Sequence, residues 1–312
     1  MDRPVSISIV ILTYQRMKLL RQLLAALGEL QYRPLEIIVV DNHSDEDVAG
    51  MVGAEFPGMR IIALSENAGA VGRNVGIKAA GGEIIVTIDD DIFGLTDQYL
   101  AELATAFADP KLGAACFNVL DAEGEKVSDW CHHYPVETHA GQEFVTNDFP
   151  EGAVAFRRAT LAVTGIYPES FFISHEGPDL ACRILDHGYE VRYLPGIAVT
   201  HHHSPQGRAS WRRYYYDTRN TLWLAIRNFP FGYGFRYVFV GMGAMLVYAV
   251  RDGFFRYWLK GVIDSLRGLG AALETRKCLT PETMALMRGI DRHRPGVFTM
   301  ARKRLFQREV RI

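Results

Sequence analysis

The chain has 312 residues, enough for one large domain or two, and its content of 48% hydrophobic and 22% charged residues excludes a wholly disordered protein. The formal net charge of −2 argues against a general nucleic-acid-binding protein. The four cysteines are widely spaced and include no C-x-x-C pair, so they indicate neither a zinc knuckle nor a disulfide framework and favour a reducing, cytoplasmic setting.

The first ninety residues alternate strand-like and helix-like segments. The pattern predicts strands at 6–12, 35–40, 60–64 and 83–88, and helices at 19–27 and 70–80. Such alternation indicates a parallel sheet with helices on both faces, in which ligands bind beyond the carboxyl ends of the strands. Polar clusters follow three of these strands, at Thr13–Arg16, Asp41–Ser44 and Asp89–Asp91, so we expect them to meet at one edge of the sheet.

The most specific feature is Asp89-Asp90-Asp91, which directly follows a β-branched apolar run. Adjacent carboxylates repel one another and resist burial unless positive charge neutralises them. Carboxylate oxygens suit Mg²⁺ or Mn²⁺, and Mg²⁺ takes few protein ligands when substrate phosphates are present. We therefore predict a metal site for a diphosphate; a solvated turn that caps the next helix is the alternative.

Side chains after the first two strands are candidates for binding a nucleoside. Thr13, Tyr14 and Arg16 offer a hydroxyl, an aromatic ring and a guanidinium group for a nucleoside and its phosphates. Asp41 ends the second strand, where its carboxylate could accept hydrogen bonds from a base or from ribose hydroxyls. The alternatives are ordinary loop residues and, for Asp41, an Asx-turn or a helix cap.

A glycine-rich stretch at Glu66–Asn74 precedes a predicted helix. Its small residues allow close approach of backbone to a ligand, and a helix N-terminus favours phosphate. The stretch is neither a Walker loop nor a G-x-G-x-x-G motif. We nominate Asn67, Gly69, Arg73 and Asn74 as contacts to this ligand. The alternative is an ordinary turn followed by a surface arginine.

Two later segments carry further chemistry. His175–Leu180 opens a predicted helix over about 179–187, where Asp179 is either a helix cap or a general base that deprotonates an acceptor hydroxyl. His201-His202-His203 closes a strand-like run, and imidazole is a ligand for Mn²⁺ in mixed sites. We expect one of these histidines to be a metal ligand.

Composition changes after residue 228. The uncharged run Tyr237–Val250 is shorter than the roughly 20 residues that cross a bilayer. An amphipathic pattern follows, and the chain closes on a basic segment that includes Arg302, Lys303, Arg304, Arg308 and Arg311. These features predict a helical region at 229–312 that associates with an anionic membrane surface; a buried helical subdomain or an oligomer interface is the alternative.

In order and spacing, these motifs resemble family 2 glycosyltransferases of the GT-A fold, with rhamnosyltransferase-like members the nearest. The resemblance covers about residues 5–230 and centres on the Asp-x-Asp pattern of Asp89 and Asp91. Other matching segments are Val10–Arg16, Val39–Ser44, Asn67–Gly69, Gly152–Arg158, Asp179–Leu180 with Arg183, Gly188–Tyr189, Leu194–Gly196 and His201. It implies an α/β, Rossmann-like, mostly parallel sheet flanked by helices in a domain at 1–228, followed by a C-terminal helical extension at 229–312.

The resemblance also implies roles for individual residues. Asp41 would recognise the nucleoside, and Asp90 would lie at the donor site. Asp89 and Asp91 would hold a divalent ion and the diphosphate, and His201 would complete the metal shell. An acceptor hydroxyl would attack the anomeric carbon with inversion while a carboxylate removes its proton.

The chain departs from the family at that base. The family usually shows Glu-Asp-x-Asp-Leu, whereas this chain has Gly177 where the first Asp is expected. Either Glu176 or Asp179 then serves as the base, or activity is altered or lost. We favour Glu176, because it lies just outside the predicted helix and has the longer reach.

The leading hypothesis is an inverting, metal-dependent glycosyltransferase of the hexosyltransferase type that moves a sugar from a UDP- or dTDP-sugar to a hydroxyl of a glycan or lipid-linked acceptor. Polysaccharide synthesis at the cytoplasmic face of the membrane would fit this activity. Trp130, His132 and Gly152 are acceptor-side candidates, with core packing as the alternative for the aromatic side chains.

Two other functions are retained as alternatives. A sugar nucleotidyltransferase would have a glycine-rich loop with Arg and Lys after the first strand, and this chain has none there. A non-catalytic sugar-nucleotide-binding protein is consistent with Gly177. We expect no nucleic-acid partner; a membrane surface and a second copy of the chain are the other partners considered.

Overall fold

The computed structural model describes residues 4–203, 211–294 and 296. The strands are β1 (Ile7–Thr13), β2 (Leu35–Asp41), β3 (Arg60–Ala63), β4 (Ile84–Asp89), β5 (Ile92–Phe93), β6 (Leu112–Leu120), β7 (Phe144–Val145), β8 (Ala153–Arg157) and β9 (Glu190–His201). The α-helices are α1 (Met17–Gly28), α2 (Val48–Glu55), α3 (Arg73–Ala79), α4 (Asp97–Ala106), α5 (Val136–His139), α6 (Arg158–Thr164), α7 (Glu176–Asp186), α8 (Arg212–Asn228), α9 (Phe231–Arg251), α10 (Phe255–Arg267), α11 (Leu269–Glu274) and α12 (Pro281–Asp291). Short 3₁₀ helices are η1 (Gly69–Gly72) and η2 (Glu169–Phe171).

One mixed sheet organises the first two hundred residues. Its strand order is β3-β2-β1-β4-β8-β6-β9-β5, with β7 paired to β9. The first four strands along the chain are parallel, as the alternating pattern predicts, whereas β8 runs antiparallel to both β4 and β6. The register pairs Thr13 with Asp41 and Leu12 with Asp89, so the predicted polar clusters come to the same edge of the sheet.

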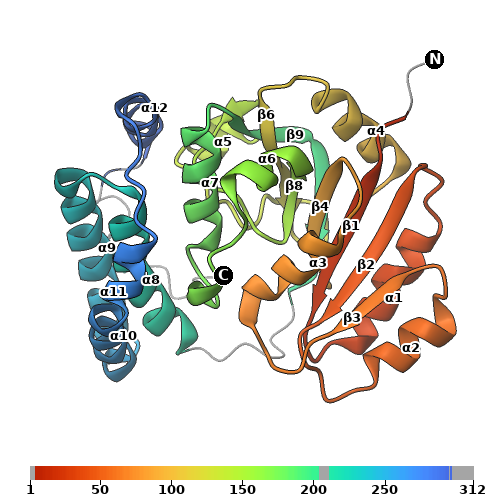
Figure 1. The fold of residues 1–312 in the computed structure, drawn as a ribbon, viewed down its shortest axis with the longest axis horizontal. Helices are drawn as coiled ribbons and strands as arrows, with labels where there is room; N and C mark the ends of the chain where they lie inside the picture. Colours follow the sequence, from red (N-terminus) through yellow and green to blue (C-terminus); the bar gives the residue numbers. More distant parts are fainter. Residues whose placement is uncertain (1–3, 204–210, 295, 297–312) are drawn as a thin grey trace.

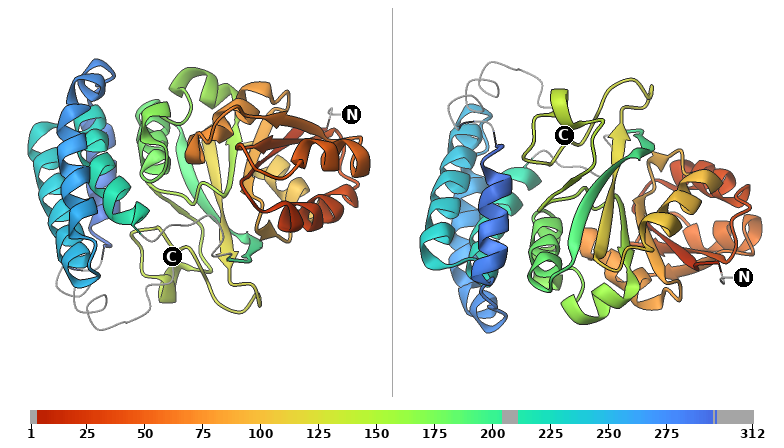
Figure 2. Two further views of the ribbon diagram at one scale, coloured as in Figure 1. Left: turned by 90° about the horizontal axis from the view of Figure 1, so that it is seen from below. Right: turned by 90° about the horizontal axis from the view of Figure 1, so that it is seen from above.

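Apolar side chains cover both faces of this sheet. On one face, Leu20, Val52 and Leu100 bring α1, α2 and α4 into a core with β1, β4 and β6. On the other face, α3, α6 and α7 pack against the same strands, with Leu180 fully buried. The helices α8 to α11 form a further layer beside α7, which Figures 1 and 2 show from three directions.

The C-terminal layer differs in length from the sequence prediction. Helix α9 continues for 21 residues and includes Arg236, because this side chain is exposed and its charge stays in water. Among the described residues it is the one helix that is long and apolar enough to cross a membrane, judged by length and composition alone. The helical layer also includes α8, which lies before residue 229 and packs against α9, α10 and α11. The basic residues from Arg302 onward lie outside the described residues.

Helix α3 lies unusually close to the sheet, and a glycine makes this possible. A Cβ atom at Gly76 would lie 2.4 Å from Val10 Cγ1 and 2.9 Å from Val40 Cγ2. Both valines are fully buried in β1 and β2, so they have little freedom to move. The close packing fixes the position of Arg73 in the first turn of the same helix.

We predict that Gly76→Ala lowers the free energy of unfolding by about 1–2 kcal/mol, because overpacking outweighs the better helix propensity of alanine. Urea unfolding measures the change. Gly53→Ala in α2 is the matched control, because a Cβ atom at Gly53 has no neighbouring atom within 4 Å. This substitution should be neutral or slightly stabilising. Equal effects of the two substitutions would contradict the close contact.

Candidate active site

The three consecutive aspartates after β4 are the centre of the polar edge. Asp90 accepts hydrogen bonds from Thr13 Oγ1 at 2.7 Å and from Arg16 Nη1 at 2.8 Å. The same Arg16 nitrogen lies 2.5 Å from Asp91 Oδ2. Burial raises the pKa of Asp90 to about 7, although Arg16 and Thr13 favour its charged form. Residues from the ends of β1 and β4 therefore share one charged cluster.

A second arginine holds the first aspartate. Arg73, which is buried at the start of α3, forms an ion pair with Asp89 and donates to the Ala70 carbonyl at 3.0 Å. Asp89 also lies against Gly152, where a Cβ would come within 2.6 Å of its carboxylate. Gly152 thus allows the turn before β8 to approach the aspartates closely.

His201, at the end of β9, faces this cluster. Its Nε2 lies 3.3 Å from Asp91 Oδ1, and its Nδ1 lies 2.5 Å from Asp129 Oδ2. Burial opposes the charged imidazole, but Asp129 and Asp91 outweigh it and raise the pKa of His201 to about 9. Asp129, His201 and His203 also bring ligand atoms within 4.8 Å of one another, which is a geometry that could hold a metal ion.

Sequence reasoning did not nominate Asp129. It lies 72 residues from His201 along the chain, in a loop where it adopts a φ of 48°. No local motif marks such a contact, and only the fold brings the two side chains together.

The nucleoside-side candidates lie at the ends of β1 and β2. Asp41 is buried and accepts a hydrogen bond from the Ser44 N–H at 3.1 Å, which is an Asx-turn contact. Tyr14 is half-buried. Asn42, which the site prediction omitted, supports the glycine-rich loop by bonding both Asn67 Oδ1 and the Gly69 carbonyl.

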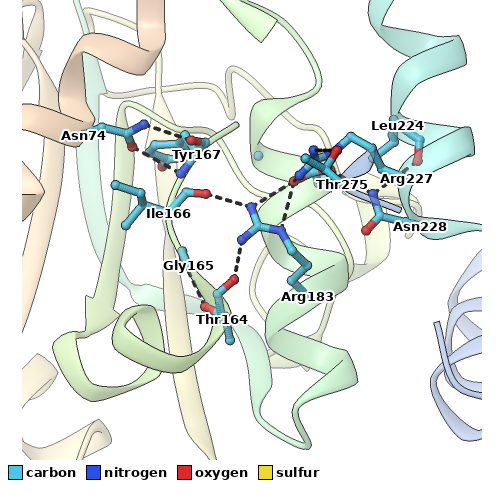
Figure 3. Close-up of polar contacts among 12 residues, drawn as sticks. Asn74, Thr164, Gly165, Ile166, Tyr167, Arg183, Leu224, Arg227, Asn228 and Thr275 are labelled. Carbon is cyan, nitrogen blue, oxygen red and sulfur yellow. Dashed lines mark hydrogen bonds and ion pairs between the residues drawn. The ribbon is translucent and has the colours of Figure 1, made fainter. Parts of the chain in front are cut away.

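Two residues of the glycine-rich stretch have structural contacts. Asn74 turns its amide inward and exchanges two hydrogen bonds with the backbone of Tyr167, at 2.8 and 3.2 Å (Figure 3). Gly69 has a φ of 70°, and a Cβ there would lie 2.2 Å from the Phe172 carbonyl oxygen. Only glycine fits this contact between the loop and the segment before α7.

Asp179 is the centre of a buried ionic network in α7. Its carboxylate binds Arg183 at 2.8 Å, Arg227 at 2.8 Å and the Asn228 amide at 2.8 Å. Burial disfavours the charged carboxylate, but the two arginines outweigh burial and lower the pKa of Asp179. Figure 3 shows how Arg183 extends the network to the Thr164 and Ile166 carbonyls. The contacts join α7 to α8 and to the loop after α6.

Glu176, the other nominated base, opens α7. It is 2% exposed, and burial together with the neighbouring charge of Glu151 raises its pKa well above the ordinary value. The segment before it is held by α8, because the Asn220 amide donates to the carbonyls of Phe171, Ile173 and Ser174.

The nominated acceptor residues belong to an aromatic cluster beside β7 and β9. Trp130 packs edge-on against His132 and Tyr193, and its indole N–H donates to the Tyr134 carbonyl at 2.7 Å. Burial lowers the pKa of His132 to about 3, so its ring is neutral. These contacts favour a packing role for both rings, and Gly152 alone of the three borders the aspartates.

Comparison with known proteins supports the same reading. A family model described as glycosyl transferase family 2 matches residues 8–163. The O-antigen chain rhamnosyltransferase WbaN of Salmonella anatum is 23% identical over 198 residues, covering 59% of this chain and 61% of that relative. The chain therefore spans less than two thirds of WbaN. The dTDP-rhamnosyl transferase RfbF of Shigella flexneri is 23% identical over 301 residues, covering 83% of this chain and 94% of the relative.

A solved structure extends the likeness over nearly the whole chain. The mannosyltransferase PcManGT from Pyrobaculum calidifontis, in complex with GDP-Man and Mn²⁺, superposes with a TM-score of 0.55 at 20% identity. The match covers 98% of this chain and 89% of that one. The predicted GT-A fold is thereby confirmed.

We predict that Asp179→Asn lowers the free energy of unfolding by about 2–4 kcal/mol at neutral pH, because it removes the fully buried carboxylate that pairs with two partly buried arginines. Since the folded-state pKa of Asp179 is depressed, its contribution is present above the ordinary pKa and is lost as pH falls through the folded value. Urea unfolding at pH 7 and at about pH 3 should show the difference between wild type and variant shrinking in acid.

The matched control is Glu55→Gln, which breaks an exposed pair with Arg21 and should change stability by less than about 1 kcal/mol. A stable Asp179→Asn protein that has lost activity would contradict the structural role and return Asp179 to the catalytic candidates.

Proposed function

The chain belongs to glycosyl transferase family 2, and on this premise we propose that it moves a sugar from a UDP- or dTDP-sugar to a hydroxyl of a glycan or lipid-linked acceptor, with inversion at the anomeric carbon. The observation that carries the proposal is the meeting of Asp91, His201 and Arg16 at the carboxyl edge of the sheet. Open α/β sheets bind ligands at this edge. The rhamnosyl relatives support a sugar-nucleotide donor.

The residues present fit a divalent cation. Asp91 offers oxygen and His201 offers Nε2, while Nδ1 of the same ring is held by Asp129. A carboxylate behind a ligating histidine fixes the ring and its tautomer, which is the usual arrangement of metal-bound histidine. A cation and a proton would compete for Nε2. When bound, Mn²⁺ or Mg²⁺ would neutralise the diphosphate as it leaves.

The chain's own residues have separable roles in this proposal. Arg16 and Arg73 pair with Asp89–Asp91 and hold these carboxylates at the edge of the sheet where the donor phosphates would bind. Asp41, Thr13 and Tyr14 lie where the nucleoside would bind, next to the loop of Asn67 and Gly69. Of the two residues nominated from sequence as the catalytic base, Glu176 is the better candidate. The oxygens of Asp179 are already bound to arginine and asparagine.

The helical layer supports membrane association. Phe231, Phe235 and Phe239 are 85%, 64% and 73% exposed, and they follow one another at helical spacing on one side of α9. The other side of α9 packs on α8 and α10, so this helix would lie on a bilayer rather than cross it. Arg236, Arg256 and Lys260 are exposed nearby and suit anionic lipid. We place the protein at the inner face of the cytoplasmic membrane.

For the metal we predict that removal of Mn²⁺ by a chelator weakens the binding of the sugar-nucleotide donor about tenfold or more, and that Asp91→Asn does the same. Asp129→Asn should weaken the binding of Mn²⁺ itself by about 10–100-fold. Calorimetry with UDP- and dTDP-sugars measures the donor affinity, and calorimetry with Mn²⁺ alone measures the metal affinity. Glu125→Gln, at an exposed position, is the control and should change neither. Donor affinity that ignores both chelator and Asp91→Asn would refute the metal site, and donor binding without any turnover would favour the non-catalytic alternative.

For the membrane we predict that the full-length protein floats with vesicles of phosphatidylglycerol and phosphatidylethanolamine, and that Phe235→Glu with Phe239→Glu removes most of this binding. The cause is the loss of exposed apolar area and the repulsion of added negative charge. Val163→Glu, at an exposed apolar position on α6, is the control and should bind like wild type. Equal flotation of both variants would refute the surface, and self-association lost with the phenylalanines would assign this face to an oligomer interface.

A further inference from the structure

The first turn of α7 contains Gly177, and the space beside this glycine is filled by the side chain of another residue. A Cβ atom on Gly177 would lie 2.5 Å from Glu151 Oε1 and 3.0 Å from the Phe149 carbonyl oxygen. The same Glu151 oxygen accepts a hydrogen bond from the Gly177 N–H at 2.9 Å. A carboxylate from the turn before β8 therefore occupies the space where a side chain at position 177 would begin.

Three acidic residues lie in the first turn of α7 or beside it, and they differ in burial. Asp179 is fully buried and bound to two arginines. Glu176 is 2% exposed. Glu151 is partly buried as a whole residue, so it is the least buried of the three.

The backbone of Glu151 is also held close to the end of β4, where the aspartates begin. The next residue, Gly152, lies against the carboxylate of Asp89, and its carbonyl accepts the Asp89 N–H at 3.2 Å. Thr87 of β4 donates to the Glu151 carbonyl at 2.9 Å. These bonds hold the backbone of Glu151 against the strand that carries the aspartates.

We propose that Glu151 is the catalytic base of the transfer, an inference that rests on the proposed glycosyltransferase function. The Gly177 N–H holds Oε1, and Oε2 takes the proton from the acceptor O–H. The acceptor oxygen then bonds to the anomeric carbon, and the bond from that carbon to the diphosphate oxygen breaks, its electron pair leaving with the nucleoside diphosphate. Atoms and charge balance without another reactant.

Burial and nearby charges act on both glutamates. Burial raises the pKa of Glu151 above its ordinary value, and the positive charge of Arg73 and the Gly177 N–H oppose this rise without cancelling it. Burial and the charge of Glu151 also raise the pKa of Glu176 well above its ordinary value. The role that the sequence analysis gave to Glu176 moves to Glu151 on the geometry, because the Gly177 N–H holds Glu151 Oε1 in the space where a side chain at position 177 would begin.

The first test compares Glu151→Gln with Glu176→Gln in the full-length protein with Mn²⁺. The probe is hydrolysis of UDP- and dTDP-sugars, in which water is the acceptor. We expect Glu151→Gln to lower kcat about 100-fold with donor Kd unchanged, and Glu176→Gln to lower it by less than about tenfold. Glu169→Gln, on the exposed η2, is the control and should match wild type. The opposite order of the two variants would overturn the proposal.

The second test uses Glu151→Ala with added azide, a nucleophile that carries no proton to remove. We expect azide to raise its turnover about tenfold or more, with glycosyl azide as the product seen by mass spectrometry, because only proton removal is missing. A merely structural role of Glu151 predicts no rescue, and absence of rescue would overturn the proposal.

The third test returns a carboxylate to the same space from the other side. In Glu151→Ala with Gly177→Asp, the Glu151 oxygen 2.5 Å from a Cβ at 177 is gone, and only the Phe149 carbonyl oxygen at 3.0 Å remains close. We expect at least about tenfold more turnover than in Glu151→Ala alone. A wild-type protein that hydrolyses none of the donors it binds would refute the glycosyltransferase itself. Wild-type hydrolysis with Glu151→Gln unaffected would refute only the base.

Discussion

The structure depends on keeping three consecutive carboxylates at the end of a buried strand. Asp90 and Asp91 are almost fully buried, and adjacent charges at such a site are costly unless opposite charge lies within contact distance. Arg16 arrives from the loop after β1, Arg73 from the first turn of α3, and His201 from the end of β9. The same contacts that make burial tolerable also bring these elements to one edge of the sheet. Stability and the candidate site thus rest on the same charges.

The parts of the molecule that follow local rules could be predicted from sequence. Apolar runs such as Ile84–Ile88 fix strands, and the alternation with helices fixes a parallel first half of the sheet with its ligand edge. The antiparallel β8 was not predicted, because its short run Ala153–Arg157 carries no sign of its direction. The helix predicted from 70 to 80 begins as the 3₁₀ turn η1. In this turn the Ala70 N–H donates to the Phe172 carbonyl.

The site could be predicted only where its residues are close to a motif. The run Asp89–Asp91 is recognisable in the sequence because its three acids are adjacent. Asp129 and Glu151 are isolated acids, and their partners His201 and Gly177 lie far along the chain. The absence of a side chain at 177 was visible in the sequence, but its replacement from another element was not. A motif that lacks its usual catalytic side chain therefore does not by itself indicate lost activity, because a residue from another element can occupy the same space.

Helix α8 joins the candidate site to the apolar helical layer. On one side, Asn220 holds three carbonyls of the segment before α7, and Arg227 binds Asp179 inside that helix. On its other sides α8 packs against α9 and α10, which carry the exposed phenylalanines. A force on the helical layer would have to break buried polar contacts before it moved α7 relative to α8, and such contacts are costly to leave unmade. The start of α7 therefore keeps a fixed position relative to the apolar face, and an acceptor held at a membrane surface would meet the Glu151 carboxylate in one orientation.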